Sequence, residues 1–532
     1  MAGIGLARES SLPFRPLRRG PAKECHTTSG VDANCMVRAP TGIAGLDYVL
    51  DGGLPAGRLY LVQGDPGAGK TTLGMQFLVE GARLGEAGIF ASLSETEAEL
   101  RDIAASHGWE LDGIAICDLQ AGQRLPRDAA QDTLFHPAEV ELGETTRALL
   151  DAIDQIRPAR LVLDSLSQIR LLSRDALRYR RQILSIKEHL RAYDCTLLLL
   201  NYAPDADLPL QSLAQGLITL EQLAPAYGGQ RRRLRIEKLR GAGFREGHHD
   251  FSIRRGGIVV FPRLVAADHH HAGSLETVGS GIGELDDLLG GGIARGTSTM
   301  LMGPSGVGKT TIAAQFAVTA AGRGERVVIY LFDELPRVWT KRCQGLGMDV
   351  ESLVSRRLID LHRVDPAQLS PGELANAIQQ QVEQGARMVV LDSLNGYQNA
   401  MPEEHYLSMH LRELLAYLDD RGVLTLLIMT EHGLVGTLVE SSVQLTYLAD
   451  NVLLLRYFEA FGEVRQAISA VKKRTGSHER SIRELRLSAG GIAIGRVLTE
   501  FQGVLGGDLT YVGNMDPLLK TAGGGEHMFE DV

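Results

Sequence analysis

The sequence predicts an α/β protein made of two tandem domains, each built on a mostly parallel β-sheet. The first observation is length, because 532 residues exceed what one hydrophobic core usually supports. The second is an internal repeat: the segment that begins at Thr41 returns, with the same order of apolar, glycine and lysine–threonine positions, at Ser280. The third is the order of patterns within each copy, in which apolar strands alternate with amphipathic helices, an order typical of parallel sheets covered by helices on both faces.

Each expected element has a counterpart in the other half. A glycine-rich loop follows the first strand and leads into a helix, and later apolar runs end in an acidic residue before one more buried strand. The matched pairs are helices at 71–84 and 310–322, strands at 88–93 and 327–332, strands at 161–165 and 389–393, and strands that begin at Thr196 and Leu424. The repetition of this order predicts the same fold twice.

The repeat and the local composition together divide the chain into five segments. They are a disordered tail at 1–37, a first domain at 38–265, a linker at 266–276, a second domain at 277–506 and a flexible tail at 507–532. The linker holds His269, His270 and His271 in a row, which fit a solvated connector or, as an alternative, a metal site.

Composition narrows the class of protein. A net charge of −10 disfavours a protein whose main affinity is for phosphate backbones, although a local basic groove is compatible with that total. The longest apolar runs are far shorter than the roughly 20 residues that span a bilayer. The five cysteines are scattered and the N-terminus lacks the apolar core of a secretory signal, so we expect a cytoplasmic protein.

Two loops match the pattern of a phosphate-binding P-loop, each in the strand-to-helix context that this chemistry requires. Glycines let successive N–H groups point at phosphate oxygens, and the N-terminus of the following helix favours the same anion. Each loop's lysine would reach the β- and γ-phosphates of ATP. The expected ATP-binding residues are Gly64, Gly67, Gly69, Lys70, Thr71, Thr72, Gly303, Gly306, Gly308, Lys309, Thr310 and Thr311.

Two aspartates are candidate Mg²⁺ ligands together with the P-loop threonines. Asp164 and Asp392 end apolar strands, and a carboxylate there faces the P-loop across the carboxyl edge of the sheet. We therefore expect Thr71 with Asp164, and Thr310 with Asp392, to hold the metal. The alternative is that each aspartate only caps its strand.

Activation of the attacking water or hydroxyl needs a carboxylate at the end of a neighbouring strand. The first half offers Glu95 after Ser94, and the second half offers Asp333 and Glu334. The alternative is that Ser94 or Asp333 is the N-cap of the helix that follows.

These features together resemble the KaiC family of RecA-like ATPases and autokinases. The resemblance rests on the TGI and SGI openings, the two P-loops, the acidic pairs, the two LDS strands and a late Lys-x-Arg, and it covers residues 38–506. It implies a hexameric ring in which Lys238, Arg240, Lys472 and Arg474 reach the ATP of a neighbouring subunit. In the family two adjacent glutamates follow the strand after the P-loop helix, the first being the general base, whereas this chain has Ser94 and Asp333 at that first position.

The resemblance also implies a phosphorylated segment before a late strand. Thr446 is the matching acceptor here, Tyr447 replaces the second acceptor, and Ser441 and Ser442 are further candidates. The leading hypothesis is therefore an ATPase with serine/threonine autokinase activity in the second half, an oligomeric switch for signalling partners.

Two other functions remain as alternatives. One is a DNA-dependent RecA-type motor, with the arginines at 231–233 and Arg235 as its contact surface, although the same cluster fits a solvated strand edge before the strand that bears Lys238. The other is a nucleotide-binding scaffold without turnover, which the absence of the first glutamate in the first half supports.

Overall fold

The computed structural model describes residues 36–119, 137–173, 176–202, 208–224, 228–265, 276–365, 367–399, 406–431, 446–505 and 510–512. Four sequence-based predictions lie outside these residues: the linker histidines, Ser441, Ser442 and most of the two tails. By their internal contacts the residues form two units, Met1–Val265 with Asp365–Gln380, and Ala266–Val364 with Gln381–Val532.

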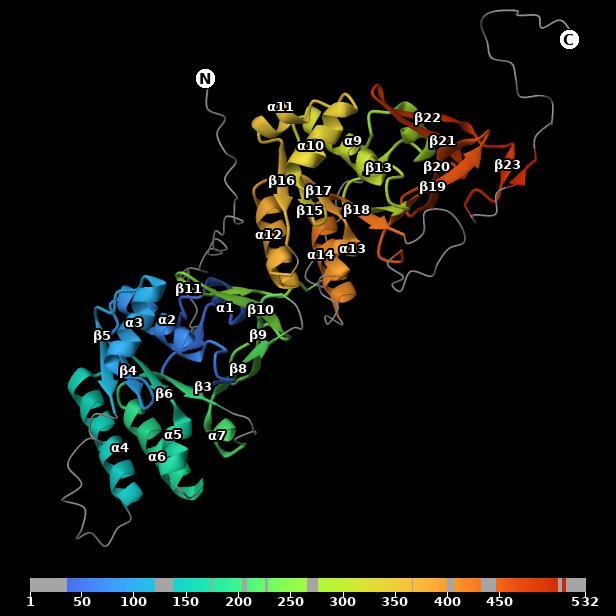
Figure 1. Ribbon diagram of the computed structural model, residues 1–532. Coiled ribbons are helices and arrows are strands. Elements are labelled where there is room, and N and C mark those ends of the chain that lie inside the picture. Colours follow the sequence, from blue (N-terminus) through green and yellow to red (C-terminus); the bar gives the residue numbers. More distant parts are fainter. Residues whose placement is uncertain are drawn as a thin grey trace, which may run out of the picture. The chain divides into compact units, whose positions relative to one another are not determined.

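Among the described residues of the first unit, nine strands form one sheet in the order β11-β10-β9-β8-β3-β7-β6-β4-β5 (Figure 1). The strands from β8 to β5 run parallel, and β9 to β11 extend the sheet as antiparallel neighbours. The strands are β3 (Leu59–Gly64), β4 (Gly88–Ser92), β5 (Ile114–Asp118), β6 (Arg160–Asp164), β7 (Thr196–Asn201), β8 (Gly216–Leu223), β9 (Arg231–Leu239), β10 (His249–Arg254) and β11 (Gly257–Phe261). The helices are α1 (Ala44–Val49), α2 (Lys70–Arg83), α3 (Glu97–His107), α4 (Pro137–Ile156), α5 (Leu166–Ser173), α6 (Ala176–Arg191) and α7 (Leu208–Leu213).

The second unit repeats this arrangement. Its nine described strands are ordered β16-β15-β17-β18-β14-β19-β20-β21-β22, parallel from β16 to β19 and antiparallel beyond. The strands are β14 (Ser298–Gly303), β15 (Arg326–Leu331), β16 (Ile359–Arg363), β17 (Ala386–Asp392), β18 (Leu424–Thr430), β19 (Asn451–Ala460), β20 (Glu463–Lys473), β21 (Arg483–Ser488) and β22 (Gly491–Val497). The helices are α8 (Gly283–Leu288), α9 (Lys309–Gly322), α10 (Pro336–Gly345), α11 (Val350–Ser355), α13 (Leu394–Asn399) and α14 (Leu407–Asp420). Helix α12 (Pro371–Glu383) spans both units, and its residues up to Gln380 belong to the first.

Three short antiparallel pairs complete the described elements. They are β1 (Arg38–Ala39) with β2 (Leu54–Pro55), β12 (Thr277–Val278) with β13 (Ile293–Ala294), and β23 (Phe501–Gln502) with β24 (Thr510–Tyr511). The predicted pair of α/β domains with mostly parallel sheets is confirmed.

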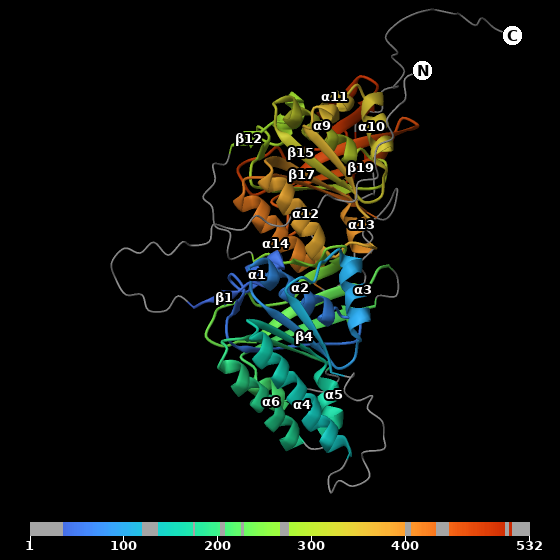
Figure 2. The same ribbon diagram turned by 90° about the vertical axis from the view of Figure 1, so that its left-hand side faces the viewer.

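The central strands are buried on both faces, as the continuous apolar runs predict. In β6, Val162 packs into the core beneath α1, α2 and α3, whereas Leu161 and Leu163 pack into a second core beneath α4, α5 and α6. Figure 2 shows α4, α5 and α6 side by side on that face. Neighbouring residues of one strand therefore serve opposite faces, and the side chains at the strand ends meet along the edges of the sheet.

Candidate functional site

The first P-loop joins β3 to α2. Gly69 has φ 100°, a left-handed conformation that glycine adopts readily, and helix α2 begins at the next residue, Lys70. A side chain at Gly64 would bring a Cβ within 2.4 Å of the Leu220 carbonyl oxygen. Lys70 Nζ donates to the carbonyl oxygens of Gly64 at 2.8 Å and Asp65 at 2.9 Å, and burial lowers the pKa of this lysine.

The second P-loop has the same construction between β14 and α9. Lys309 Nζ donates to the carbonyl oxygens of Gly303 at 2.8 Å and Pro304 at 2.6 Å. Burial lowers the pKa of Lys309 to about 8, and the charges of Asp392 and Glu431 act against that shift. Both lysines therefore lie against their own loop, where incoming phosphates would meet them.

In each half, the P-loop threonine is hydrogen-bonded to an aspartate that ends a strand two positions away in the sheet. Thr71 Oγ1 donates to Asp164 Oδ2 at 2.7 Å, and Thr310 is hydrogen-bonded to Asp392. Burial raises the pKa of both aspartates to about 6. Hydroxyl and carboxylate oxygens are ligands that Mg²⁺ accepts beside substrate phosphates, so this donor set fits Mg²⁺.

The carboxylate of Glu95 lies just beyond β4 in the first half. Ser94 Oγ donates to Glu95 Oε2 at 2.7 Å, and Ser92 Oγ accepts from the Glu95 backbone N–H at 2.9 Å. The N-cap of α3 is Thr96, which forms a capping box with Glu99. The alternative that Ser94 caps this helix is therefore wrong, because Thr96 satisfies the first free N–H groups.

The second half places Asp333 and Glu334 just beyond β15. Asp333 Oδ2 accepts a hydrogen bond of 2.7 Å from Ser393 Oγ, and Glu334 forms an ion pair of 2.8 Å with Arg342. Helix α10 has Leu335 at its N-cap, without a side-chain cap. The alternative that Asp333 is the N-cap is therefore wrong, and its carboxylate is hydrogen-bonded to Ser393, the residue after Asp392.

The cations of the two Lys-x-Arg pairs lie at the opposite edge of each sheet from the P-loop. Lys238 pairs in register with Leu217 near the start of β8, and its Nζ donates to the Gln211 carbonyl oxygen at 2.8 Å. Arg240 N–H donates to the Gln215 carbonyl oxygen, also before β8. The P-loop of this half follows the other end of β3, so neither cation meets it.

The second half repeats that separation. Lys472 Nζ donates to the carbonyl oxygens of Thr446 at 2.9 Å and Ala449 at 2.6 Å. Arg474 forms an ion pair of 3.1 Å with Asp450 and donates to the Tyr447 carbonyl oxygen. A cavity of about 330 Å³ lies beside these groups, lined among others by Ser298, Arg412 and Asp419. The turn that carries Thr446 is thus bound directly by both cations.

The arginine cluster belongs to β9 itself, which begins at Arg231. The prediction that it precedes the strand bearing Lys238 is therefore wrong, because one strand holds both. Arg233 lies 3.9 Å from Glu221, and Arg235 forms an ion pair of 3.0 Å with Glu237. Neighbouring carboxylates balance much of this charge, which favours a strand within the sheet over a surface for DNA.

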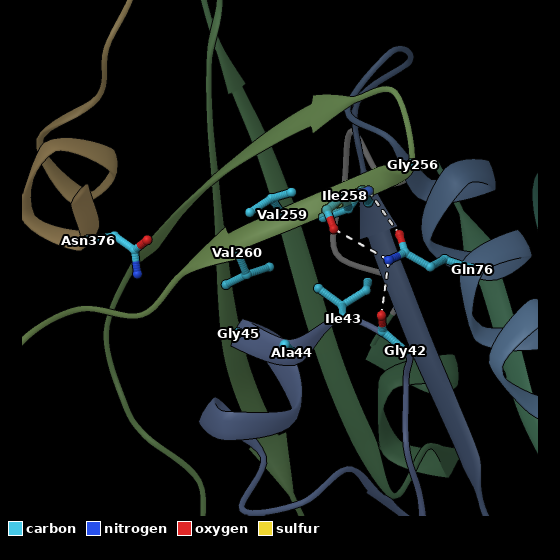
Figure 3. Close-up of a pocket in the computed structure, with 10 residues that line it drawn as sticks. All are labelled: Gly42, Ile43, Ala44, Gly45, Gln76, Gly256, Ile258, Val259, Val260 and Asn376. Carbon is cyan, nitrogen blue, oxygen red and sulfur yellow. Dashed lines mark hydrogen bonds between the residues drawn. The ribbon is translucent and has the colours of Figure 1, made fainter. Parts of the chain in front are cut away.

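A separate pocket of the first unit, about 190 Å³, is lined by residues other than those of the P-loop (Figure 3). Gln76 is its main polar side chain: its Nε2 donates to the Gly42 and Ile258 carbonyl oxygens, and its Oε1 accepts from the Ile258 N–H at 2.8 Å. None of the described residues that line the pocket is charged, so we assign it a structural role.

Sequence reasoning missed two contacts of the second site. One is Ser393 with Asp333, and the other is an ion pair between Glu431 and Arg456. The signal for the first was the serine after each strand-ending aspartate, and for the second the replacement of Tyr202 in the first half by Glu431 in the second.

Within the described part of the chain, every helix is too short or too polar to cross a membrane. Over the same residues, no three or more His, Cys, Asp or Glu side chains gather where they could hold a metal by themselves.

The comparisons with known proteins agree with this geometry. A family model described as the KaiC ATPase matches residues 39–265 and 278–498. The chain is 26% identical over 481 residues to the circadian clock protein KaiC3 of Synechocystis sp., which covers 88% of this chain and 94% of that relative. It is 26% identical over 491 residues to the circadian clock oscillator protein KaiC of Synechococcus elongatus, a match that covers 90% of this chain and 92% of that relative. It is 28% identical over 490 residues to the circadian clock protein KaiC2 of Synechocystis sp., with 88% of this chain and 84% of that relative covered. Because the family model covers most of both halves, the chain belongs to the KaiC ATPase family.

Proposed function

We propose that the chain is an oligomeric ATPase in which each ATP site is completed by a second copy, and in which the second half also transfers the γ-phosphoryl group to Thr446. The observation that carries this proposal is the separation of groups across each sheet. Lys309, Thr310 and Asp392 lie at the carboxyl edge, whereas Lys472 and Arg474 lie at the amino edge. Cations that cannot reach the ATP of their own half are available to the ATP of a neighbour.

In each site the P-loop N–H groups and lysine hold the phosphates of ATP. Mg²⁺, held by Thr71 with Asp164 and by Thr310 with Asp392, would neutralise charge on the transferred phosphoryl group. The neighbour's Lys472 and Arg474, or Lys238 and Arg240 in the first half, stabilise the charge that develops on that group, as arginine fingers do.

The two halves differ in the group that accepts the proton of the nucleophile. In the second site Asp333 would take the proton from water or from the hydroxyl of a neighbouring copy's Thr446, because Thr446 lies with Lys472 at the opposite edge of its own sheet, and Ser393 orients the aspartate through its hydrogen bond. The first site has Ser94 at that position, which leaves Glu95 as the nearest candidate. We therefore propose faster turnover in the second half, with the first half binding ATP mainly to hold the oligomer together.

The assembly we propose is a hexameric ring, as the family resemblance implies, and it acts as a switch whose phosphorylation alters binding of protein partners. The contacts that support this role are those of Lys472 and Arg474 with the carbonyl oxygens of Thr446 and Tyr447. A phosphate on Thr446 would attract these cations and so change what the amino edge presents to a neighbour.

The test is incubation of the purified protein with γ-labelled ATP and Mg²⁺, beside Lys70→Ala and Lys309→Ala variants. We expect the parent both to release labelled phosphate and to retain label on the protein. Lys309→Ala should reduce both signals more than Lys70→Ala does, and Thr446→Ala should abolish the retained label. Release without retention would leave an ATPase that is not an autokinase. Bound ATP with neither signal would refute turnover in both halves.

A further inference from the structure

An ion pair lies beside the second P-loop, and among the described residues of the first half the matching positions hold no such pair. Glu431 directly follows β18, and Arg456 lies on β19, the two strands that flank β14. Arg456 Nη1 is 2.6 Å from Glu431 Oε2, and the two side chains are only 12% and 11% exposed. The pair therefore sits at the carboxyl edge of the sheet, next to the strand that ends at Gly303.

The Glu431 carboxylate is close enough to influence the P-loop lysine. The Glu431 backbone N–H donates to the Gly303 carbonyl oxygen at 3.0 Å, and Lys309 Nζ donates to the same carbonyl oxygen at 2.8 Å. The charge of Glu431 raises the pKa of Lys309 against the effect of burial. A carboxylate at this place would repel ATP phosphates unless a cation compensated it.

Arg456 supplies that cation and retains unused hydrogen-bonding capacity. Its Nε and Nη2 are buried without a hydrogen-bond partner among the described residues. The next residue, Tyr457, donates from its hydroxyl to the Ser305 carbonyl oxygen at 3.4 Å, so this stretch of β19 lies along the P-loop. The arginine is thus fixed on a strand that touches the loop directly.

The first half has different residues at the matching positions. Leu220 of β8 lies beside Gly64 as Leu455 of β19 lies beside Gly303, so Glu221 matches Arg456. The strand β7 is followed by Tyr202 where β18 is followed by Glu431. The first half thus has a carboxylate, Glu221, where the second has Arg456, and that carboxylate lies near Arg233 of β9 instead of pairing with the residue after β7.

We propose that Arg456 is a positioning residue of the second ATP site, where it neutralises Glu431 so that the P-loop and Lys309 can bind the ATP phosphates. This rests on the proposed binding of ATP at the second P-loop. Removal of Arg456 leaves a buried carboxylate beside the phosphates, whereas removal of both charges leaves neither repulsion nor an unpaired ion.

The experiment measures Mg·ATP binding by titration calorimetry on the full chain carrying Lys70→Ala, so that the second site dominates. We expect Arg456→Leu to weaken binding by about tenfold or more, because breaking a buried pair exposes the site to an uncompensated charge. Glu431→Gln, Arg456→Lys and the double variant Glu431→Gln/Arg456→Leu should each remain within about threefold of the parent. In turnover assays KM should rise in Arg456→Leu while kcat changes by less than about twofold.

The control breaks a similarly buried pair elsewhere in the second half. Arg295 lies 2.7 Å from Glu325, both side chains are 16% exposed, and the pair precedes β15, at the edge opposite the P-loop. Arg295→Leu should lower the melting temperature without changing ATP affinity. This separates loss of stability from loss of charge compensation at the site.

Two results would overturn the inference: unchanged affinity in a folded Arg456→Leu variant, or a double variant that binds as weakly as the single one. If Arg456→Leu does not fold, the comparison is with the parent: a double variant or an Arg456→Lys variant that binds ATP more than about threefold more weakly than the parent would overturn the inference. If the Lys309→Ala substitution does not weaken ATP binding by the parent, both the proposed function and this inference are overturned. That outcome is distinguishable, because it is measured with Arg456 unchanged.

Discussion

A single added methyl group tests whether the position of Asp333 controls catalysis. A Cβ at Gly396 in α13 would lie 2.8 Å from Asp333 Oδ1 and 2.7 Å from Phe332 Cβ. The carboxylate would have to move by about 0.6 Å to reach the ordinary contact distance of 3.4 Å. Because misplacement by 1 Å costs about a hundredfold in rate, we expect Gly396→Ala to lower kcat about tenfold.

Affinity for ATP should not change, because the P-loop contacts of Lys309 do not involve Asp333. Alanine in a helix interior favours folding by about 1 kcal/mol over glycine, so weaker helix formation cannot explain a slower enzyme. The assay is single-turnover hydrolysis at saturating ATP in the Lys70→Ala background, with equilibrium binding measured in parallel.

The matched control is Gly322→Ala at the end of α9, where a Cβ meets nothing within 4 Å. That variant should turn over at the parental rate. Parental kcat in Gly396→Ala would refute the role of Asp333, and equal loss of affinity and rate would indicate a general distortion of the site.

The remaining predictions concern pH, subunit mixing and the acceptor. Burial raises the pKa of Asp392 to about 6 and lowers the pKa of Lys309 to about 8. The affinity of the second site for Mg·ATP should therefore fall below pH 6, where the carboxylate is protonated, and above pH 8, where the ammonium is neutralised. Titration of Mg·ATP binding at a series of pH values checks both limits. Arg474→Ala subunits mixed with Lys309→Ala subunits should regain part of the ATPase activity that each lacks alone, and strictly additive rates would contradict action in trans. Thr446→Ala should abolish label retention while phosphate release stays within about twofold of the parent, as measured by autoradiography and phosphate detection.

Local pattern was enough to predict the fold and which residues meet at each P-loop. The strand–loop–helix order, the two P-loops and the strand-ending aspartates are contiguous signals, and helices α2 and α9 begin within one residue of the predicted start. The contact of Thr71 with Asp164 joins residues 93 positions apart, and it was predictable because parallel strands bring their carboxyl ends to one edge.

Contacts that depend on side-chain identity across the sheet were not predictable. The capping alternatives failed because the N-caps are Thr96 and Leu335, each two residues after the residue that was expected. The link from Ser393 to Asp333 and the pair of Glu431 with Arg456 join different strands, and no local period encodes them. The misplaced arginine cluster at β9 has a similar cause. Its pairing with β8 and β10 extends the strand back to Arg231, and the local sequence does not encode that pairing.

The placement of Lys472 and Arg474 at the edge opposite the P-loop has a consequence for the symmetry of the proposed assembly. In a two-fold dimer every contact of one edge with the partner's other edge forms twice, so the two copies complete each other's sites and the assembly stops at two. In a head-to-tail arrangement each copy completes the site of the next, and the contacts continue until they close as a ring or extend as a filament. In a closed ring every copy both gives and receives cations, so the loss of one copy leaves one ATP site incomplete per half at the gap.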